Sequence, residues 1–186
     1  MMNFEKHRYE VLCEDQQMAC FVRYFLIAHG ANPRKIFVWD LPMQGCGEQY
    51  VREKYPKLLQ TMRSRNYEKN WIGIVCTDAD TRTVQERIGK LKDQCEAAEI
   101  QSRSGEAVMM FIPKRNIETW IRWYEGKRDT NESEDYGHFY RNRESDCKPA
   151  AVAMAQNFRS GVFPDGTLGS VVLAYEEYRR LLRGQK

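Results

Sequence analysis

The sequence lacks several features that would assign it to a common class. No apolar run approaches the roughly 20 residues that a membrane-spanning helix needs, and the opening segment MMNFEKH lacks the cationic and apolar regions of a signal peptide. The six cysteines form no CxxC pair and have no histidine at zinc-ligand spacing, which argues against a zinc motif and suits a reducing compartment. We therefore expect a cytoplasmic protein with no membrane association.

What is present fits one folded domain. The chain has 186 residues, of which 42% are hydrophobic and 30% are charged, so it can bury an ordinary core and is too apolar to be intrinsically disordered. The net charge of +3 comes from 29 basic and 26 acidic residues. Such a mixed surface does not by itself indicate nucleic-acid binding.

Apolar segments alternate with helical patterns over the first two thirds of the chain. The predicted strands are residues 9–13, 35–40, 71–77 and 108–112, and the predicted helices between and after them include 48–64 and the segment that begins at a Thr83–Glu86 capping box. This alternation predicts parallel crossovers and an α/β three-layer sandwich with about four strands.

The last third of the chain differs in composition. Residues 127–146 are charged and polar and are expected to form a loop or insertion, and two helices are expected around 149–159 and 168–183. The expected organisation is a core over 1–126, the charged segment 127–146, and a C-terminal helical extension over 147–186 that packs on the same domain.

Acidic residues follow the predicted strands. They are Glu14 and Asp15 after the first strand, Asp40 at the end of the second, Asp78 and Asp80 after the third, and Glu118 early in the helix after the fourth. Because the carboxyl ends of parallel strands meet at one edge of a sheet, these carboxylates are expected to converge, and a bound divalent cation would relieve their repulsion. Oxygen ligands suit Mg²⁺ or Mn²⁺ rather than zinc.

The Asp78-Ala79-Asp80 segment is the most informative of these. Residues two apart on an extended chain point the same way, so both carboxylates are expected to serve one metal site while Ala79 turns toward the core. The alternative for Asp80 alone is that it caps the following helix, and Asp40 can equally well only end its strand.

At these residues the chain resembles the TOPRIM domain, which is shared by topoisomerases, primases and OLD-type nucleases. The resemblance consists of a glutamate at the end of the first strand, an Asp-x-Asp after the third, and a four-stranded Rossmann-like order. It implies that Glu14, Asp78 and Asp80 hold divalent metal. OLD-type nucleases also carry an acidic residue after strand four and a lysine downstream, positions that Glu118 and Lys148 match. The resemblance thus implies a catalytic set of these two residues with the three metal ligands, and Glu118 would be a fourth metal ligand.

The resemblance covers roughly residues 9–126, and the segment 112–120 also looks like one in small bacterial TOPRIM-like proteins, some linked to phage defence. The sequence departs from the family pattern at Asp15, where glycine is usual, and at Thr81, where a further acidic residue is familiar.

The function that the resemblance implies is a metal-dependent nuclease that hydrolyses phosphodiester bonds in DNA or RNA, with two Mg²⁺ or Mn²⁺ ions. Lys114, Arg115 and Arg82 are the candidates for contacting nucleic acid, although each can instead be a solvated surface charge. The sequence has no GxxxxGK[ST] motif, and OLD-like domains usually work beside an ATPase, so we expect a partner ATPase or other subunit in a defence or DNA-processing system. A homo-oligomer is also compatible with the sequence.

Two other functions remain open at this point. The chain can be a catalytically silent TOPRIM-like module that binds nucleic acid or a partner protein, or an α/β domain that binds a phosphorylated small molecule at the same edge. Aromatic residues interleaved with arginines further along the chain are candidates for nucleic-acid contact: Tyr136, Phe139 and Tyr140, with Arg141 and Arg143.

Overall fold

A computed structural model describes residues 2–43, 46–65, 70–101, 105–140 and 144–184. Its centre is a parallel sheet of four strands in the order β2-β1-β3-β4. The strands are β1 (Arg8–Cys13), β2 (Ile36–Val38), β3 (Trp71–Cys76) and β4 (Val108–Phe111). The predicted α/β class, with its four parallel strands and flanking helices, is confirmed.

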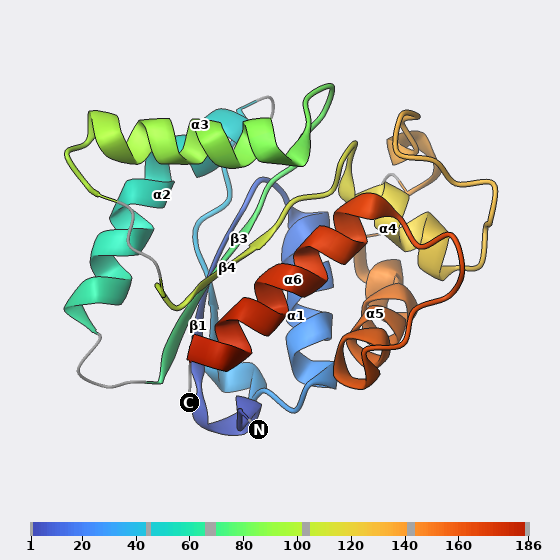
Figure 1. Cartoon of the computed structure of the whole chain (residues 1–186), viewed down its shortest axis with the longest axis horizontal. Helices are drawn as coiled ribbons and strands as arrows, with labels where there is room; N and C mark the ends of the chain where they lie inside the picture. Colours follow the sequence, from blue (N-terminus) through green and yellow to red (C-terminus); the bar gives the residue numbers. More distant parts are fainter. Residues whose placement is uncertain (1, 44–45, 66–69, 102–104, 141–143, 185–186) are drawn as a thin grey trace.

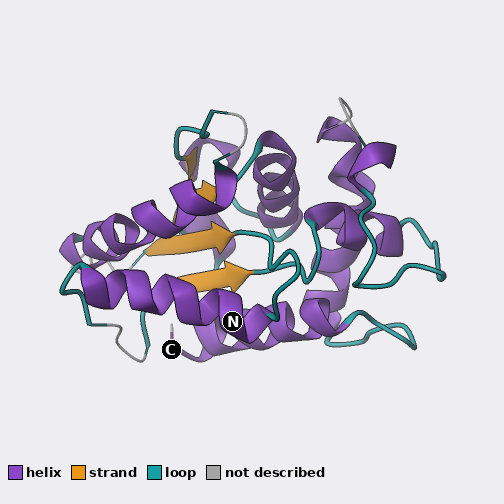
Figure 2. Cartoon of the chain, turned by 90° about the horizontal axis from the view of Figure 1, so that it is seen from above, coloured by secondary structure: helices purple, strands orange, loops and turns teal. Residues whose placement is uncertain are grey.

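Helices cover both faces of this sheet. They are α1 (Gln16–Ala28), α2 (Gly47–Ser64), α3 (Val84–Ala97), α4 (Ile117–Tyr124), α5 (Lys148–Ser160) and α6 (Gly169–Gly184), with short 3₁₀ turns η1 (Phe4–Lys6), η2 (Pro33–Lys35), η4 (Gly137–Phe139) and η5 (Glu144–Cys147). The helices α2 and α3 lie on one side, and α1, α4 and α5 lie on the other (Figure 1). Figure 2 shows the strands running in one direction between the helices.

The strand sequences explain why the sheet is central. Alternate residues of β1 face opposite sides, so Tyr9 and Val11 join the core under α1, whereas Leu12 joins the core under α2. All three side chains are fully buried. Both faces of a parallel sheet need such apolar cover, which is why its strands are nearly continuous apolar runs.

The C-terminal helices belong to the same core. Phe158 of α5 packs edge-on against Phe25 of α1 with ring centroids 5.3 Å apart, and Phe25 packs in the same way against Phe111 of β4 at 5.0 Å. Tyr178 of α6 lies in this cluster as well. The two helices therefore share one hydrophobic core with the sheet.

The strand register aligns the ends of three strands. Cys13 of β1 pairs with Cys76 of β3, which in turn pairs with Phe111 of β4. The residues that follow these strands, 14–15, 77–82 and 112–118, therefore emerge at one edge, which we call the rim. The strand order reverses between β1 and β3, and such a switch point is where open α/β sheets bind their ligands.

None of the helices formed by the described residues combines the length and the apolar character needed to cross a lipid bilayer.

Candidate functional site

Glu14 leaves β1 at the switch point and turns toward α2. Its Oε1 accepts a hydrogen bond from the Thr77 hydroxyl and another from the backbone N–H of Asp78, at 3.0 Å. Burial raises the pKa of the Glu14 carboxyl to about 7, although these two hydrogen bonds favour its ionised form. These hydrogen bonds hold the Glu14 side chain, which follows β1, against the residues that follow β3.

Gly47 makes this position of Glu14 compatible with the start of α2. A Cβ on Gly47 would lie only 2.8 Å from the Cβ of Glu14, closer than side chains approach one another. A side chain at Gly47 would therefore displace either the helix or the carboxylate.

Asp78 is the least compensated carboxylate at the rim. Its Oδ1 is buried and has no hydrogen-bond partner among the described residues. Burial raises the pKa of Asp78 well above its ordinary value, and the neighbouring carboxylates Glu14 and Glu118 raise it further. An oxygen of this kind costs free energy until a proton or a cation meets it.

Glu118 reaches the same place from the first turn of α4. The Asn116 side chain caps this helix by accepting from the backbone N–H of Thr119, at 3.2 Å. Burial raises the pKa of Glu118 to about 7, and the charges of Asp15 and Asp135 raise it further. Asp15 itself accepts from the Met18 N–H at 2.8 Å and so caps α1.

Asp80 has a different environment from Asp78. Its backbone adopts the left-handed conformation, with φ of 57°, and its Oδ2 accepts a hydrogen bond from Arg87 at 2.9 Å. Arg87, only 2% exposed, also forms an ion pair with Glu48 in the first turn of α2. Ala79 is fully buried, as predicted, but the left-handed turn sends the Asp80 carboxylate to its own cationic partner.

Among the described residues, no three His, Cys, Asp or Glu side chains are arranged to hold a metal ion. In this arrangement Glu14 and Asp80 accept hydrogen bonds from protein donors, and a metal ion shared by three of these groups would require side chains to move. The chemistry of the donors nevertheless fits a hard divalent cation, because every donor is a carboxylate oxygen and that of Asp78 is unpartnered. Glu14 and Glu118 each lie near enough to Asp78 for their charges to act on it, and the role of the three as metal ligands stays a prediction.

The predicted cationic residues occupy three different settings. Lys114 donates to the backbone carbonyl of Arg82 and so links the rim segments after β3 and β4. Arg115 forms an ion pair with Asp135 at 3.6 Å, whereas the side chain of Arg82 is exposed. Lys148, at the start of α5, lies 5.8 Å from the centre of the Tyr24 ring on α1. Lys114, Arg115 and Arg82 thus all lie on the rim segments, and Arg115 is already paired with Asp135.

Sequence reasoning missed the residues that hold the carboxylates. Thr77 and Gly47 contact Glu14, and Arg87 holds Asp80. Arg87 had a detectable signal, because it lies on the apolar stripe of α3 between Val84 and Leu91, where a charged residue needs a buried partner. Thr77 and Gly47 had none, since their contacts depend on the tertiary approach of distant segments.

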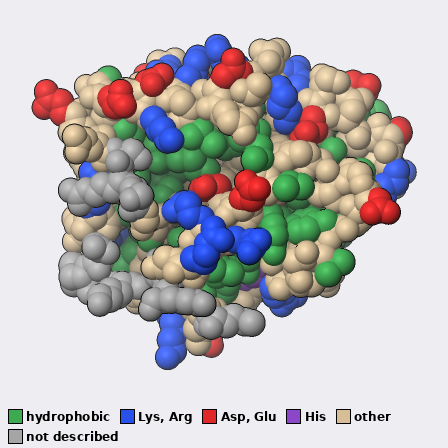
Figure 3. All heavy atoms as spheres, in the orientation of Figure 1, with side chains coloured by type: hydrophobic (Ala, Val, Ile, Leu, Met, Phe, Trp, Pro, Cys, Tyr) green, Lys and Arg blue, Asp and Glu red, His purple; other side chains and the backbone are tan. Residues whose placement is uncertain are grey.

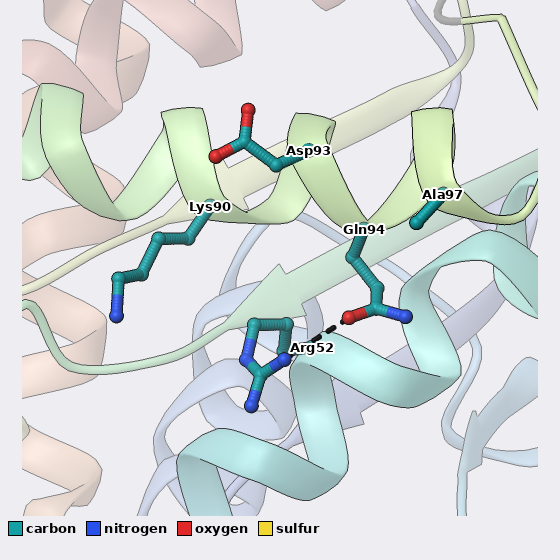
Figure 4. Close-up of a pocket in the computed structure, with 5 residues that line it drawn as sticks. All are labelled: Arg52, Lys90, Asp93, Gln94 and Ala97. Carbon is teal, nitrogen blue, oxygen red and sulfur yellow. Dashed lines mark hydrogen bonds between the residues drawn. The ribbon is translucent and has the colours of Figure 1, made fainter.

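A shallow pocket lies away from the rim, between α2 and α3, with a volume of about 420 Å³. It is lined by Arg52, Lys90, Asp93, Gln94 and Ala97. The Arg52 and Gln94 side chains point toward each other across it and form a 3.0 Å hydrogen bond (Figure 4). The pocket is lined by few residues and carries both signs of charge.

The surface as a whole carries mixed charge. In the view of Figure 3, basic and acidic side chains lie next to one another near the middle of the face, with hydrophobic side chains around them. This agrees with the small net charge of +3. A contact with nucleic acid would therefore depend on local groups rather than on a uniformly basic face.

Comparisons with protein-family models, with curated proteins and with solved structures gave no match.

Proposed function

We propose that this chain is a metal-dependent nuclease of the TOPRIM type, which hydrolyses phosphodiester bonds in DNA or RNA with Mg²⁺ or Mn²⁺. The observation that carries the proposal is the unpartnered, buried Oδ1 of Asp78 beside the Glu14 and Glu118 carboxyl groups, at the switch point of a parallel sheet. A buried carboxylate oxygen without a partner calls for an explanation, and a bound ion is one of those that protein structures offer. Asp78 differs here from Glu48 and Glu106, whose carboxylates have arginine partners.

The residues divide the work at this site. Asp78, Glu14 and Glu118 would hold the cation, and Thr77 orients Glu14 through its hydroxyl group. Bound divalent ions supply activation of a water molecule and stabilisation of the leaving oxygen in phosphodiester hydrolysis. Lys114 and Arg82, on adjoining rim segments, would orient the phosphate.

The rest of the proposal comes from the resemblance to OLD-type proteins. We place the chain in the cytoplasm, beside an ATPase or another subunit of a defence or DNA-processing system. The partner would supply the nucleotide chemistry for which this sequence has no phosphate-binding loop.

The test is cleavage of labelled DNA and RNA, single- and double-stranded, with Mg²⁺, Mn²⁺ or EDTA. The parent protein should cleave at least one polymer only when metal is present, and Asp78→Asn should remove the activity while leaving the unfolding transition cooperative. Asp165→Asn, the same chemical change at an exposed aspartate outside the rim, is the matched control and should cleave like the parent. Metal-dependent cleavage that Asp78→Asn leaves unchanged would place the reaction elsewhere.

A second candidate is the catalytically silent module that binds nucleic acid or a partner. It is favoured by the engagement of Asp80 with Arg87 and by the lack of a preassembled metal-ligand group among the described residues. Under this function the parent protein binds polymer without cutting it, with either metal.

A further inference from the structure

Four side chains next to the rim form a layered arrangement that the proposed chemistry does not use. The Arg122 guanidinium of α4 lies 4.9 Å from the centre of the Tyr136 ring and 5.4 Å from that of Phe139. The His138 ring contacts Phe139 with centroids 3.8 Å apart. We call these four residues, Arg122, Tyr136, His138 and Phe139, the stack.

Two members of the stack, His138 and Phe139, are exposed to solvent. Tyr136 is buried, whereas His138 is exposed and Phe139 is 50% exposed. Phe139 is one of few large hydrophobic residues with that much exposure among the described parts of the chain. Its exposed surface does little for folding, because apolar area stabilises a protein only when it leaves water.

The position of the stack relative to the rim is fixed by hydrogen bonds. Asp135 accepts from the Asn116 side chain and from the backbone N–H of Gly137, both at 2.8 Å. A Cβ on Gly137 would lie 3.9 Å from Oε1 of Glu118. Phe139 follows two residues later, so its Cα is at most about 7 Å further along the chain.

The cation in the stack supports the rings. Arg122 also forms a 2.8 Å ion pair with Asp129, so its charge is already compensated. A guanidinium held against aromatic rings, with further rings open to solvent, is the kind of platform on which unpaired bases stack. A duplex does not offer the face of an internal base, and a single strand does.

We propose that the stack binds an unpaired base of a single-stranded nucleic acid whose backbone passes over the rim. This inference rests on the proposed function, since it names the strandedness of the polymer that the rim would cleave. Arg141 and Arg143, which the sequence suggested as companions of these aromatic residues, lie outside the described residues.

The test is binding of a fluorescein-labelled oligo-dT of about 15 nucleotides, measured by anisotropy in EDTA so that cleavage plays no part. Phe139→Ala and His138→Ala should each weaken binding by about 5- to 100-fold. Phe139→Trp, which retains a stacking surface, should bind as tightly as the parent. Phe37→Ala removes a comparably exposed ring (42%) from β2 and should leave the affinity unchanged.

Salt dependence separates stacking from phosphate contact. The slope of log affinity against log salt concentration counts phosphate contacts, so Phe139→Ala should lower affinity at every salt concentration without changing the slope. Lys114→Ala should reduce the slope. A matched duplex should bind more weakly than the single strand, and the Phe139→Ala substitution should affect its binding little.

The inference is overturned if the parent protein does not bind the single strand, or if Phe139→Ala and His138→Ala both bind within twofold of the parent. Failure of the proposed function looks different: the stack variants lose binding, but the parent cleaves nothing with either metal. A third outcome separates the two proposals. If the Phe139→Ala and His138→Ala variants still cleave with metal and bind substrate as tightly as the parent, the stack does not bind the polymer, and the nuclease proposal is unaffected.

Discussion

Asp78 and Asp80 are two residues apart at the same rim, yet only the Asp80 carboxylate has a cationic partner among the described residues. Asp78 has a buried oxygen without a hydrogen-bond partner among the described residues, and its neighbours Glu14 and Glu118 are acidic. Asp80 is exposed and paired with the buried guanidinium of Arg87. One side of the rim therefore contains its own counter-charge, and the other side does not.

This difference indicates that a bound cation would be stabilising beside Asp78 rather than beside Asp80. On the Asp80 side, Arg87 pairs with both Asp80 and Glu48, and Glu48 also pairs with Arg52. The two carboxylates thus already have two cationic partners, and a bound metal would gain little there. On the Asp78 side, Glu14, Asp78 and Glu118 all have raised pKa values, and the charges of Glu14 and Glu118 both act on Asp78, so a proton or a metal ion is required there to offset the repulsion. The predicted Asp-x-Asp pair thus divides into one candidate ligand and one structural residue.

The largest expected effect is on the pH dependence of stability. Glu14 and Glu118 have pKa values of about 7 in the folded protein, against 4.5 when unperturbed, so the folded state holds more protons than the unfolded chain between these values. The free energy of unfolding should therefore decrease as pH rises from about 4.5 to about 7, by at most about 7 kcal/mol for the two groups together.

Urea unfolding in EDTA across this range measures the effect. The double variant Glu14→Gln/Glu118→Gln should flatten the profile, because the two titrations are removed. A parent profile that coincides with that of the double variant would mean that these carboxyl groups titrate normally.

The second-largest expected effect is the loss of stability when Arg87, the buried arginine, is replaced. Arg87→Met leaves Asp80 and Glu48 without their buried partner and should lower the free energy of unfolding by about 3 kcal/mol. Arg82→Met, an exposed arginine on the same rim, should change it by less than about 0.5 kcal/mol. Equal losses in the two variants would show that burial of Arg87 carries no special role.

The two aspartates should respond with opposite signs to the same chemical change. Asp78→Asn replaces a carboxyl group whose ionised form has no partner, and it should stabilise the metal-free protein by about 2 kcal/mol at alkaline pH, where Asp78 is ionised. Asp80→Asn breaks the pair with Arg87 and should destabilise it by about 1 kcal/mol. Thermal and urea unfolding of both variants give the comparison, and a shared sign would remove the distinction between the two sides.

The smallest expected effect concerns the space beside Glu14. Gly47→Ala places a Cβ against Glu14 and should cost about 1 kcal/mol through the shift it forces. Gly89→Ala in α3 is the matched control, because a Cβ there meets nothing within 4 Å and alanine favours the helix. Stabilisation by both substitutions would show that α2 does not press on Glu14.

Much of the fold was predictable because the signals are local. The apolar runs mark β1, β3 and β4 to within one or two residues, and the Thr83–Glu86 capping box begins α3 as expected. The second strand is shorter than predicted, since Lys35 belongs to the 3₁₀ turn η2 and the regular strand stops at Val38. The placement of Glu14 and Asp78 at the same edge of the sheet followed from the topology alone.

The rest of the site depends on information that no local pattern contains. The left-handed backbone at Asp80 and the reach of Arg87 to it are set by how α3 packs against the start of α2. The aromatic residues of 136–140 are predicted as a group, but no local pattern indicates that Tyr136 is buried and Phe139 exposed. Tertiary contacts decide both.

Anomalous diffraction from crystals soaked in Mn²⁺ tests the central claim most directly. The account predicts a peak at about 2.0–2.6 Å from carboxylate oxygens of Asp78 and Glu14, and its loss in Asp78→Asn crystals. A well-diffracting soaked crystal without a peak at this side of the rim, or with a peak bound only through Asp80, would contradict it.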